Sequence, residues 1–516
     1  MQILPGLIEQ YCTHRHNLGF YTDVVVSAFY TPRQSPASTS TSTSTSTSTG
    51  GNPPGDAPLL QALIYRALHR LIPQHPALYT TVCDEHTNAP YYATLDKVDL
   101  SLVVYIYQGG QGPDVDLDAV VKQAINRDFF RHPTAEVTAS ANNSPAHVCW
   151  RVVIVPGCSV DGVSGFWVIW AYHHAIADGT SGKIFHRDLL RILNSGDLED
   201  GDAPSPIVFL NRPDGQEHIV SFPPPLESVF TPSLGLGYIL KACCNEYLPF
   251  TLDANLKLWS CGTQPAKQEC FIPPTGLRTE LHTLRISNEV VLGALNEARK
   301  HNTTISALLE ALLSLAILEV FPSHDAVRVI LVFSARRWLG DKLAAYGGAD
   351  NVLGLYVIQD SQDFTRATLS SSPGEQPLAG LWAAAKWAKD RIDQVIDTRG
   401  KNTLGALLRF VTSFDYHFKS KIGKHRGEGL EVSNIGVFEG EASGAGTKWN
   451  ISEMRFAQSA SVVGVALTCS VISVYGEAMC LGFTWQEGVA SREEIEKVCG
   501  RTKELLEMVS AAGLSN

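Results

Sequence analysis

Two adjacent histidines, His173 and His174, end an apolar run of the sequence, and Asp178 and Gly179 follow them. An imidazole with an ordinary pKa of about 6.5 can take a proton from a hydroxyl group and later return it, so His174 could act as a general base. Asp178 could accept a charge-assisted hydrogen bond from an arginine and fix the turn, while Gly179 permits a sharp bend. The His–Asp spacing alone is weak evidence, because a histidine satisfied at a turn also explains that fragment.

The elements around this pattern are expected to place it at the edge of a sheet. An apolar strand is expected at 166–172 and a helix at 182–193, with a second apolar strand at 148–155. A side chain at the end of a strand is held by the sheet and exposed at its edge. The complete His-His-x-x-x-Asp-Gly pattern between a strand and a helix is therefore far more specific than the His–Asp pair.

Strands and helices are mixed along both halves of the chain. Further strands are expected at 23–30, 102–107, 280–286, 327–333, 352–358, 430–437, 463–474 and 478–483. Further helices are expected at 58–72, 117–130, 236–244, 288–300, 305–320, 380–396, 404–410 and 492–509. This mixture predicts an α/β (α+β layered) fold with two domains of about 200 residues each.

Changes in composition suggest where the domains meet. The first domain is expected at 1–200 and the second at 276–516, joined by a Pro-rich crossover at 201–275. Ser and Thr alternate through positions 38–49, and this tract has no apolar face to bury. We therefore expect a disordered loop at 35–57, a tolerated insertion rather than a phosphorylated regulatory segment.

Charge and cysteine content argue against several classes of protein. The 516 residues include 41 Lys and Arg against 52 Asp and Glu, a net charge of −11, which disfavours a nucleic-acid partner. No secretory signal is visible in residues 1–17, and the longest apolar stretch, 306–321, contains Glu310 and Glu319 and is too short to span a bilayer. The 11 cysteines include no Cys-x-x-Cys, so we expect reduced thiols, no metal site and a cytoplasmic protein.

The complete histidine pattern resembles the signature of the chloramphenicol-acetyltransferase-like (HxxxD) acyltransferases. That superfamily includes condensation domains of peptide synthetases, plant BAHD acyltransferases and fungal alcohol O-acetyltransferases. The chain is most similar to the alcohol acetyltransferase branch, at residues 15–21, 223–227 and 432–436. Within that branch it resembles the trichothecene 15-O-acetyltransferases. The Asp-Phe-Gly-Trp-Gly motif of the plant branch is absent, and residues 433–436 stand in the equivalent late region.

This resemblance implies two similar domains that form a pseudo-dimer around an active-site tunnel, which acyl-CoA and the acceptor alcohol enter from opposite ends. It makes His174 the general base and His173 a structural neighbour. Asp178 then points away from the substrate and pairs with an arginine, for which Arg336 is favoured over Arg337. The implied reaction is direct transfer from acetyl-CoA, with no metal, no permanently bound cofactor and no acyl-enzyme. Two paired domains in one chain make a monomer sufficient.

Other residues are candidates for supporting roles. Ser433 and Asn434 could donate to the oxyanion of a tetrahedral intermediate, although packing at a strand end is the simpler role. Ser181 follows Asp178 but lacks the Gly-x-Ser-x-Gly setting of a hydrolase nucleophile, so we expect it at the start of a helix. Four basic residues of one loop could hold the 3′-phosphoadenosine end of CoA, or could simply form a solvated surface. They are Lys419, Lys421, Lys424 and Arg426.

Three functions remain open at this point. The first is a CoA-dependent O-acyltransferase that acts on a hydroxyl group of a small secondary metabolite, such as a sesquiterpenoid in mycotoxin biosynthesis. The second is a condensation-type enzyme that uses a carrier-protein thioester, although no carrier domain is apparent in the chain. The third is a binding protein that keeps the fold without the chemistry, which the intact His174, Asp178 and Gly179 disfavour.

Overall fold

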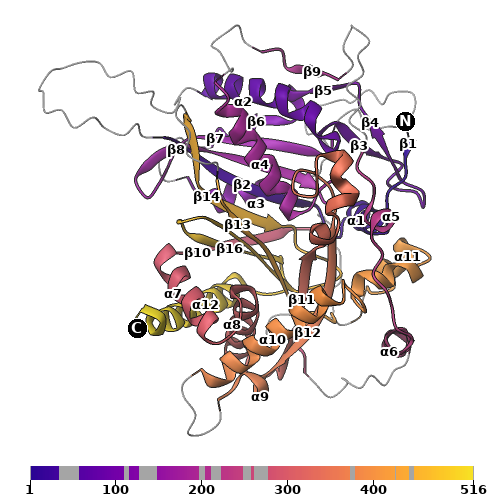
Figure 1. Ribbon diagram of the computed structural model, residues 1–516, viewed down its shortest axis with the longest axis vertical. Helices are drawn as coiled ribbons and strands as arrows, with labels where there is room; N and C mark the ends of the chain where they lie inside the picture. The colour runs from indigo at the N-terminus through magenta and orange to yellow at the C-terminus, as the bar shows by residue number, and fades with distance from the viewer. Residues whose placement is uncertain are drawn as a thin grey trace, which may run out of the picture.

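Figure 1 shows the computed structural model, in which strands from both halves of the chain are flanked by helices. The described residues are 2–33, 57–109, 115–126, 148–196, 204–210, 222–247, 257–260, 277–371, 378–422, 424, 426–440 and 447–514. The Ser-Thr tract and the last residues of the helix expected at 117–130 lie outside these ranges.

A five-stranded sheet carries the histidine pattern at the end of one of its strands. In spatial order its strands are β14 (Trp449–Gln458), β2 (Asp23–Pro32), β8 (Val163–His173), β7 (Trp150–Val160) and β6 (Val104–Ile106). β8 lies between β2 and β7 and is antiparallel to both. Asp23, the first residue of β2, pairs with His173, the last residue of β8. The sheet therefore fixes the backbone directly before His174.

The two faces of this sheet are covered by different helices. Successive side chains of a strand point to opposite faces. Val24 of β2 accordingly packs in the same core as α2 (Ala57–Leu71) and α4 (Gly179–Leu193), whereas Val25 packs with α3 (Leu117–Ile125). Because both faces are buried, the central strands are nearly continuous apolar runs, which is why the sequence revealed them.

A second sheet of six strands is built from the other half of the chain. Its order is β10 (Thr279–Ile286), β16 (Met479–Gln486), β15 (Leu467–Val474), β13 (Leu430–Phe438), β11 (Ala326–Ser334) and β12 (Val357–Thr365). The long helices of this half are α7 (Asn288–Lys300), α8 (Ile305–Val320), α10 (Ala379–Asp397) and α12 (Arg492–Leu514). α8 is apolar on nearly all sides because it packs between this sheet, α10 and α12.

Short elements complete the described chain. Two small sheets are formed by β1 (Gln2–Ile3), β4 (Tyr91–Thr94) and β3 (Thr80–Cys83), and by β5 (Lys97–Asp99) with β9 (Ile207–Phe209). The remaining α-helices are α1 (Leu7–Asn17), α5 (Leu226–Val229), α6 (Leu236–Tyr247), α9 (Arg366–Leu369) and α11 (Phe414–Lys419). Short 3₁₀ helices lie at 72–74, 76–79, 100–102, 335–338, 340–346 and 404–410.

Among the described residues no single helix is long and apolar enough to cross a membrane. One pair of helices there, α7 with α8, reaches that length and composition together, and the pair is bent by 101°.

Strand β14 joins the two halves of the molecule. It comes from the residues expected to form the second domain, yet it pairs with β2 of the first sheet. It also lies against β15 and β16, where the missing side chain of Gly482 lets β16 approach the carbonyl oxygen of Phe456 closely. The division of the chain at 1–200, 201–275 and 276–516 stays a prediction, and the first sheet takes strands from both sides of it.

The layered α/β fold expected from the sequence is confirmed, but some elements differ. The strand expected at 352–358 is wrong, because residues 352–356 are irregular and β12 begins only at Val357. The helix expected at 404–410 is a 3₁₀ helix, and the strand expected at 463–474 begins at Leu467. Neither α1 nor β14 was predicted from the sequence.

Candidate active site

His174 follows the last residue of β8 and begins the turn that leads into α4. Its side chain is half-buried, and its Nδ1 lies 3.1 Å from the backbone carbonyl oxygen of Ala177. A carbonyl oxygen only accepts hydrogen bonds, so Nδ1 carries the proton and the lone pair of the neutral ring is at Nε2. Burial, and then the positive charge of Arg15, lower the pKa of His174 to about 4. The ring is therefore neutral at pH 7, the state in which Nε2 can accept a proton.

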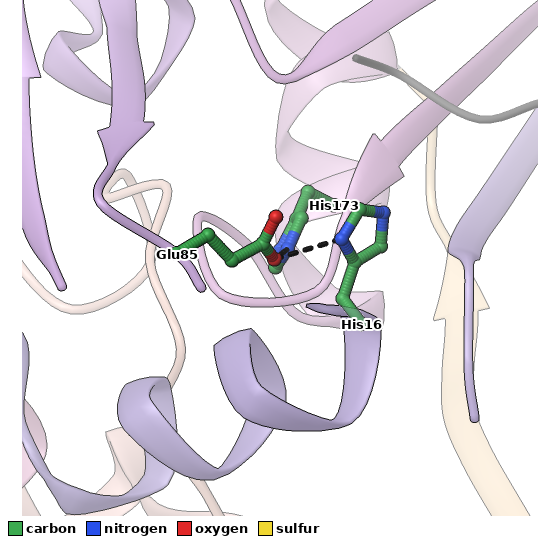
Figure 2. Close-up of side chains that lie close together, drawn as sticks. All are labelled: His16, Glu85 and His173. Carbon is green, nitrogen blue, oxygen red and sulfur yellow. Dashed lines mark hydrogen bonds and ion pairs between the residues drawn. The ribbon is translucent and has the colours of Figure 1, made fainter. Parts of the chain in front are cut away.

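His173 is fully buried and points away from the course of β8 toward the turn after β3 and the end of α1 (Figure 2). Its Nε2 lies 3.1 Å from Oε1 of Glu85, and its Nδ1 accepts a hydrogen bond from the N–H of Ala175 at 2.9 Å. The same oxygen of Glu85 lies 2.7 Å from Nδ1 of His16. Both ring nitrogens of His173 thus contact the protein itself, as expected of a structural neighbour of the base.

The carboxylate of Asp178 pairs with the guanidinium of Arg336, the arginine that the resemblance favoured, whereas Arg337 is exposed. The two paired side chains are 1% and 4% exposed. Asp178 also accepts hydrogen bonds from the backbone N–H groups of Ser181 at 2.9 Å and Tyr356 at 3.0 Å. Burial by itself raises the pKa of Asp178, but Arg336 and these N–H groups hold it below its usual value. Asp178 is therefore ionised and turned toward the second half of the chain.

The first turn of α4 is built around this ion pair. Asp178 is the N-cap residue of α4, and the helix begins at Gly179. Oγ of Ser181 lies 3.0 Å from Oδ1 of Asp178 and 3.1 Å from Nη2 of Arg336, so Ser181 is the helix-start residue that we expected. A Cβ atom on Gly179 would lie 2.7 Å from Cγ2 of Ile435, so this glycine lets the helix approach β13 closely.

Tyr21 and Arg15 line another side of His174, and the sequence assigned no role to either. The rings of Tyr21 and His174 are stacked, with centroids 5.8 Å apart and planes inclined by 29°. The guanidinium carbon of Arg15 lies 3.8 Å from the centroid of the Tyr21 ring, which makes a cation–π contact. The hydroxyl of Tyr21 donates to Oε1 of Gln458 on β14 at 3.3 Å. The available signal was the position of both residues in the stretch 15–21, which resembles the alcohol acetyltransferases.

The side chain of Asn434 is engaged between β13 and α8. Its Nδ2 donates to Oγ of Ser306 at 3.0 Å, and its Oδ1 accepts from the N–H of Gly436 at 2.8 Å. Asn434 thus has a packing role in the middle of β13, where the register with β15 shifts, and not at the strand end that we expected. Ser433 points to the other face of β13, is 6% exposed, and lies opposite Ser470 of β15. The amide of Asn434 is used by these hydrogen bonds. Ser433 takes no part in them and is therefore the better of the two candidates for the oxyanion donor.

Arg426, one of the four basic residues expected to bind the cofactor, lies inside the protein. It is 7% exposed, and its guanidinium donates to the carbonyl oxygens of Ser461 at 2.9 Å and Val465 at 3.2 Å and to Oε1 of Gln486 at 2.9 Å. The expectation that Arg426 holds CoA is therefore corrected, because its donors already bind the loop between β14 and β15.

The three lysines of the same stretch lie at the surface. Lys419 ends α11, is 56% exposed and pairs with Asp415 one turn earlier at 2.6 Å. Lys421 is half-buried and Lys424 is exposed, both in the turn that follows α11. These side chains stay candidates for contacts with an anionic ligand.

Comparisons with known proteins match nearly the whole chain to alcohol acetyltransferases. The family model described as alcohol acetyltransferase matches residues 5–506. A curated relative, the "Probable alcohol acetyltransferase crmB" of Aspergillus fumigatus, is 26% identical over 499 residues, which cover 94% of this chain and 95% of the relative. The "Probable alcohol acetyltransferase FCK4" of Fusarium pseudograminearum is 24% identical over 444 residues, 84% of each chain.

Solved structures share the fold at lower identity. The TRI3 trichothecene 15-O-acetyltransferase from Fusarium sporotrichioides matches with a TM-score of 0.68 at 16% identity, over 99% of this chain and 95% of that one. The condensation domain from the Monacolin K polyketide synthase MokA matches with a TM-score of 0.57 at 11% identity, over 99% and 98% of the two chains. The acyltransferase and condensation-domain fold that the histidine pattern predicted is thereby confirmed.

Proposed function

Since the chain belongs to the alcohol acetyltransferase family, we propose that it transfers an acetyl group from acetyl-CoA to a hydroxyl group of a small alcohol, with His174 as the general base. The observation that carries the mechanism is the hydrogen bond between Nδ1 of His174 and the carbonyl oxygen of Ala177. It places the basic lone pair at Nε2, and the lowered pKa keeps that lone pair available at neutral pH.

The transfer takes place in a complex of both substrates. Nε2 of His174 accepts the hydroxyl proton while the alcohol oxygen attacks the carbonyl carbon of the thioester, and the carbonyl electrons move onto oxygen. The tetrahedral intermediate then collapses, the carbon–sulfur bond breaks, and the imidazolium returns its proton to the departing thiolate. The products are an ester and free CoA, and His174 is neutral again. The protons and electrons balance without an acyl-enzyme, and the site contributes chiefly by holding the reactants together.

Asp178 does not touch the substrate in this mechanism. Its carboxylate is held by Arg336, and the residue directly before it, Ala177, supplies the carbonyl oxygen that orients His174. The ion pair thus fixes the turn on which the orientation of the base depends. We assign Asp178 and Arg336 to positioning, together with Gly179, which lets α4 begin at this turn.

Acetyl-CoA is the proposed co-substrate, and its phosphates require cationic partners. Lys419 at the end of α11, with Lys421 and Lys424 in the turn after it, supplies positive charge in a chain of net charge −11. We propose that they contact the 3′-phosphoadenosine end. Ser433 stays our candidate for the oxyanion donor, a contact typically worth about 2.7–4 kcal/mol in acyl-transfer enzymes.

For the acceptor we propose a hydroxylated secondary metabolite such as a sesquiterpenoid alcohol. Support comes from the fold shared with a protein described as a trichothecene 15-O-acetyltransferase. A carrier-protein thioester is the alternative donor, because condensation domains share the fold as well.

The test is an assay of CoA release from acetyl-CoA with a panel of hydroxylated acceptors, with mass spectrometry to detect acetylated product. Wild type is compared with His174→Ala and with a matched control, His301→Ala, whose side chain is 41% exposed at the end of α7. We expect product with wild type and the control and none with His174→Ala. Product formation that survives His174→Ala refutes the assignment of the base. Product only from an acyl carrier protein favours the condensation-type alternative.

A further inference from the structure

The cluster of His16, Glu85 and His173 lies directly beside the base and takes no part in the steps above (Figure 2). Its members come from the end of α1, the turn after β3 and the end of β8. Their ligand atoms lie within 4.8 Å of one another. Two imidazoles and one carboxylate also form catalytic zinc sites in other proteins. The cluster is therefore either a metal site or a hydrogen-bonded unit.

The hydrogen bonds of His173 decide between these possibilities. The N–H of Ala175 donates to Nδ1, which uses the lone pair of that nitrogen. The proton of the neutral ring is then on Nε2, where it faces Oε1 of Glu85 at 3.1 Å. A metal requires the lone pair of Nε2, and a metal-bound histidine ordinarily donates from its other nitrogen instead of accepting there. The protonation of His173 at Nε2 therefore fits a hydrogen-bonded unit and not a metal site.

We propose that Glu85 is a positioning residue for the base, acting through His173 and the turn that carries His174. This inference rests on the proposed function of His174. One oxygen of Glu85 accepts the Nε2–H of His173 and also lies 2.7 Å from Nδ1 of His16. His16 on α1 thus holds the carboxylate of Glu85, and this carboxylate holds the imidazole of His173.

The turn transmits this position to the base through Ala175. Its N–H is bound to the ring of His173, and its carbonyl oxygen accepts from the hydroxyl of Tyr92 on β4 at 2.8 Å. Two residues later, Ala177 provides the carbonyl oxygen that orients Nδ1 of His174. A shift of the His173 ring therefore displaces the backbone that sets the direction of Nε2. Misplacement of a reacting group by about 1 Å can cost a hundredfold in rate.

Glu85 is suited to this task because it stays ionised. Burial alone raises its pKa, but His16 and His173 hold the pKa at about 2. Its side chain is 13% exposed, whereas that of His173 is 0% exposed. A small anion from solution can therefore reach the position of the Glu85 carboxylate if that side chain is shortened.

The experiment compares Glu85→Leu, which removes the acceptor, with Glu85→Gln, which keeps a carbonyl oxygen at Oε1. We expect the kcat of Glu85→Leu to fall roughly ten- to hundredfold, with the KM for acetyl-CoA near that of wild type. Glu85→Gln should retain most of the activity. An unchanged kcat in Glu85→Leu, or an equal loss in both variants, overturns the proposal. If Glu85→Leu does not fold, Glu85→Ala replaces it, and added sodium formate should restore part of its kcat. Failure of formate to restore any activity then counts against the proposal.

A second measurement does not depend on activity. In nitrogen-15 spectra of histidine-labelled protein, assigned with His173→Gln, we expect His173 to be protonated at Nε2 and unprotonated at Nδ1. The opposite tautomer, or one zinc ion retained per chain after dialysis against zinc chloride and lost in Glu85→Leu, overturns the proposal. If wild type acetylates no acceptor, the proposed function fails, while this spectrum still tests the role of Glu85.

Discussion

Asp178 and Arg336 join the first turn of α4 to the 3₁₀ helix after β11, so a buried ion pair holds the two halves of the chain together beside the base. We expect Asp178→Asn to lower the free energy of unfolding by roughly 3–5 kcal/mol, because the guanidinium stays buried without its anion. The control is Asp363→Asn, whose pair with Arg328 is 28% and 23% exposed and should cost at most about 1 kcal/mol. Urea denaturation measures both, and equal losses would contradict the prediction.

The charge of Arg15 is expected to set part of the proton affinity of His174. After burial itself, Arg15 is the largest cause of the low pKa of His174, while Asp178 acts in the opposite direction. Tyr21 is neutral there because burial raises its own pKa. Arg15→Gln should therefore raise the pKa of His174 and move the acid limb of the kcat/KM profile to higher pH. The exposed Arg337→Gln should leave that limb in place, and an unmoved limb in Arg15→Gln would count against the electrostatic role.

His186 should make the fold less stable in mild acid. Burial lowers its pKa to about 4, and the ring contacts the hydroxyl of Tyr30 and the carbonyl oxygen of Val26, each at 3.0 Å. An unfolded histidine has a pKa of about 6.5, so between these values the unfolded chain binds more protons and stability is lost as the pH falls. The slope from one such residue is at most about 1.4 kcal/mol per pH unit.

This contribution can be isolated by comparing two pH series. Urea titrations across that window should show wild type losing stability more steeply than His186→Gln as the pH falls, whatever the stability of the variant at pH 7. Parallel curves would mean that the ring is not held neutral in the folded protein.

The lysines after α11 are expected to affect the binding of acetyl-CoA and not that of the acceptor alcohol. We expect the double variant Lys421→Ala and Lys424→Ala to raise the KM for acetyl-CoA by roughly three- to tenfold, with little change in kcat, because the contacts are made to distant phosphates. Salt should reduce the difference, since screening acts over about 8 Å at physiological ionic strength. Lys497→Ala, 61% exposed on α12, is the control. If the double variant and wild type have the same KM for acetyl-CoA, these lysines do not bind CoA.

The sequence was most informative where chemistry and structure are local. His174, Asp178 and Gly179 are close in the chain, and an apolar strand and an amphipathic helix border them, so their arrangement could be predicted locally, whereas the resemblance to the acyltransferases implied the pairing with Arg336. The pairing reaches across both halves of the chain, but a buried carboxylate requires a cation, and the arginine pair after a second-half strand offered one. Roles that follow from family resemblance alone, such as that of Ser433, stay predictions.

Residues whose role depends on distant contacts were not predictable in the same way. Arg426 lies in a run of basic residues, and nothing in the run shows that one guanidinium is buried among carbonyl oxygens. Residues 352–356 are as apolar as a strand, but carbonyl oxygens there accept from Arg336 and leave the segment irregular. Tyr21 stacks on His174 and Arg15 packs on Tyr21 only in the folded chain, so no spacing in the sequence reveals these contacts.

The pairing of β14 with β2 has a consequence for the order of synthesis. β2 ends at Pro32 and its partner begins at Trp449, so 417 positions (449 − 32) separate the two strands. At about 5–20 residues per second, the ribosome needs roughly 20–80 seconds to cover that distance. During this time the edge of β2 has open hydrogen-bonding groups, the kind of edge on which strands of other chains can add. This edge of β2 therefore stays without its native partner over that interval, and a fragment limited to the first half of the chain lacks the partner permanently.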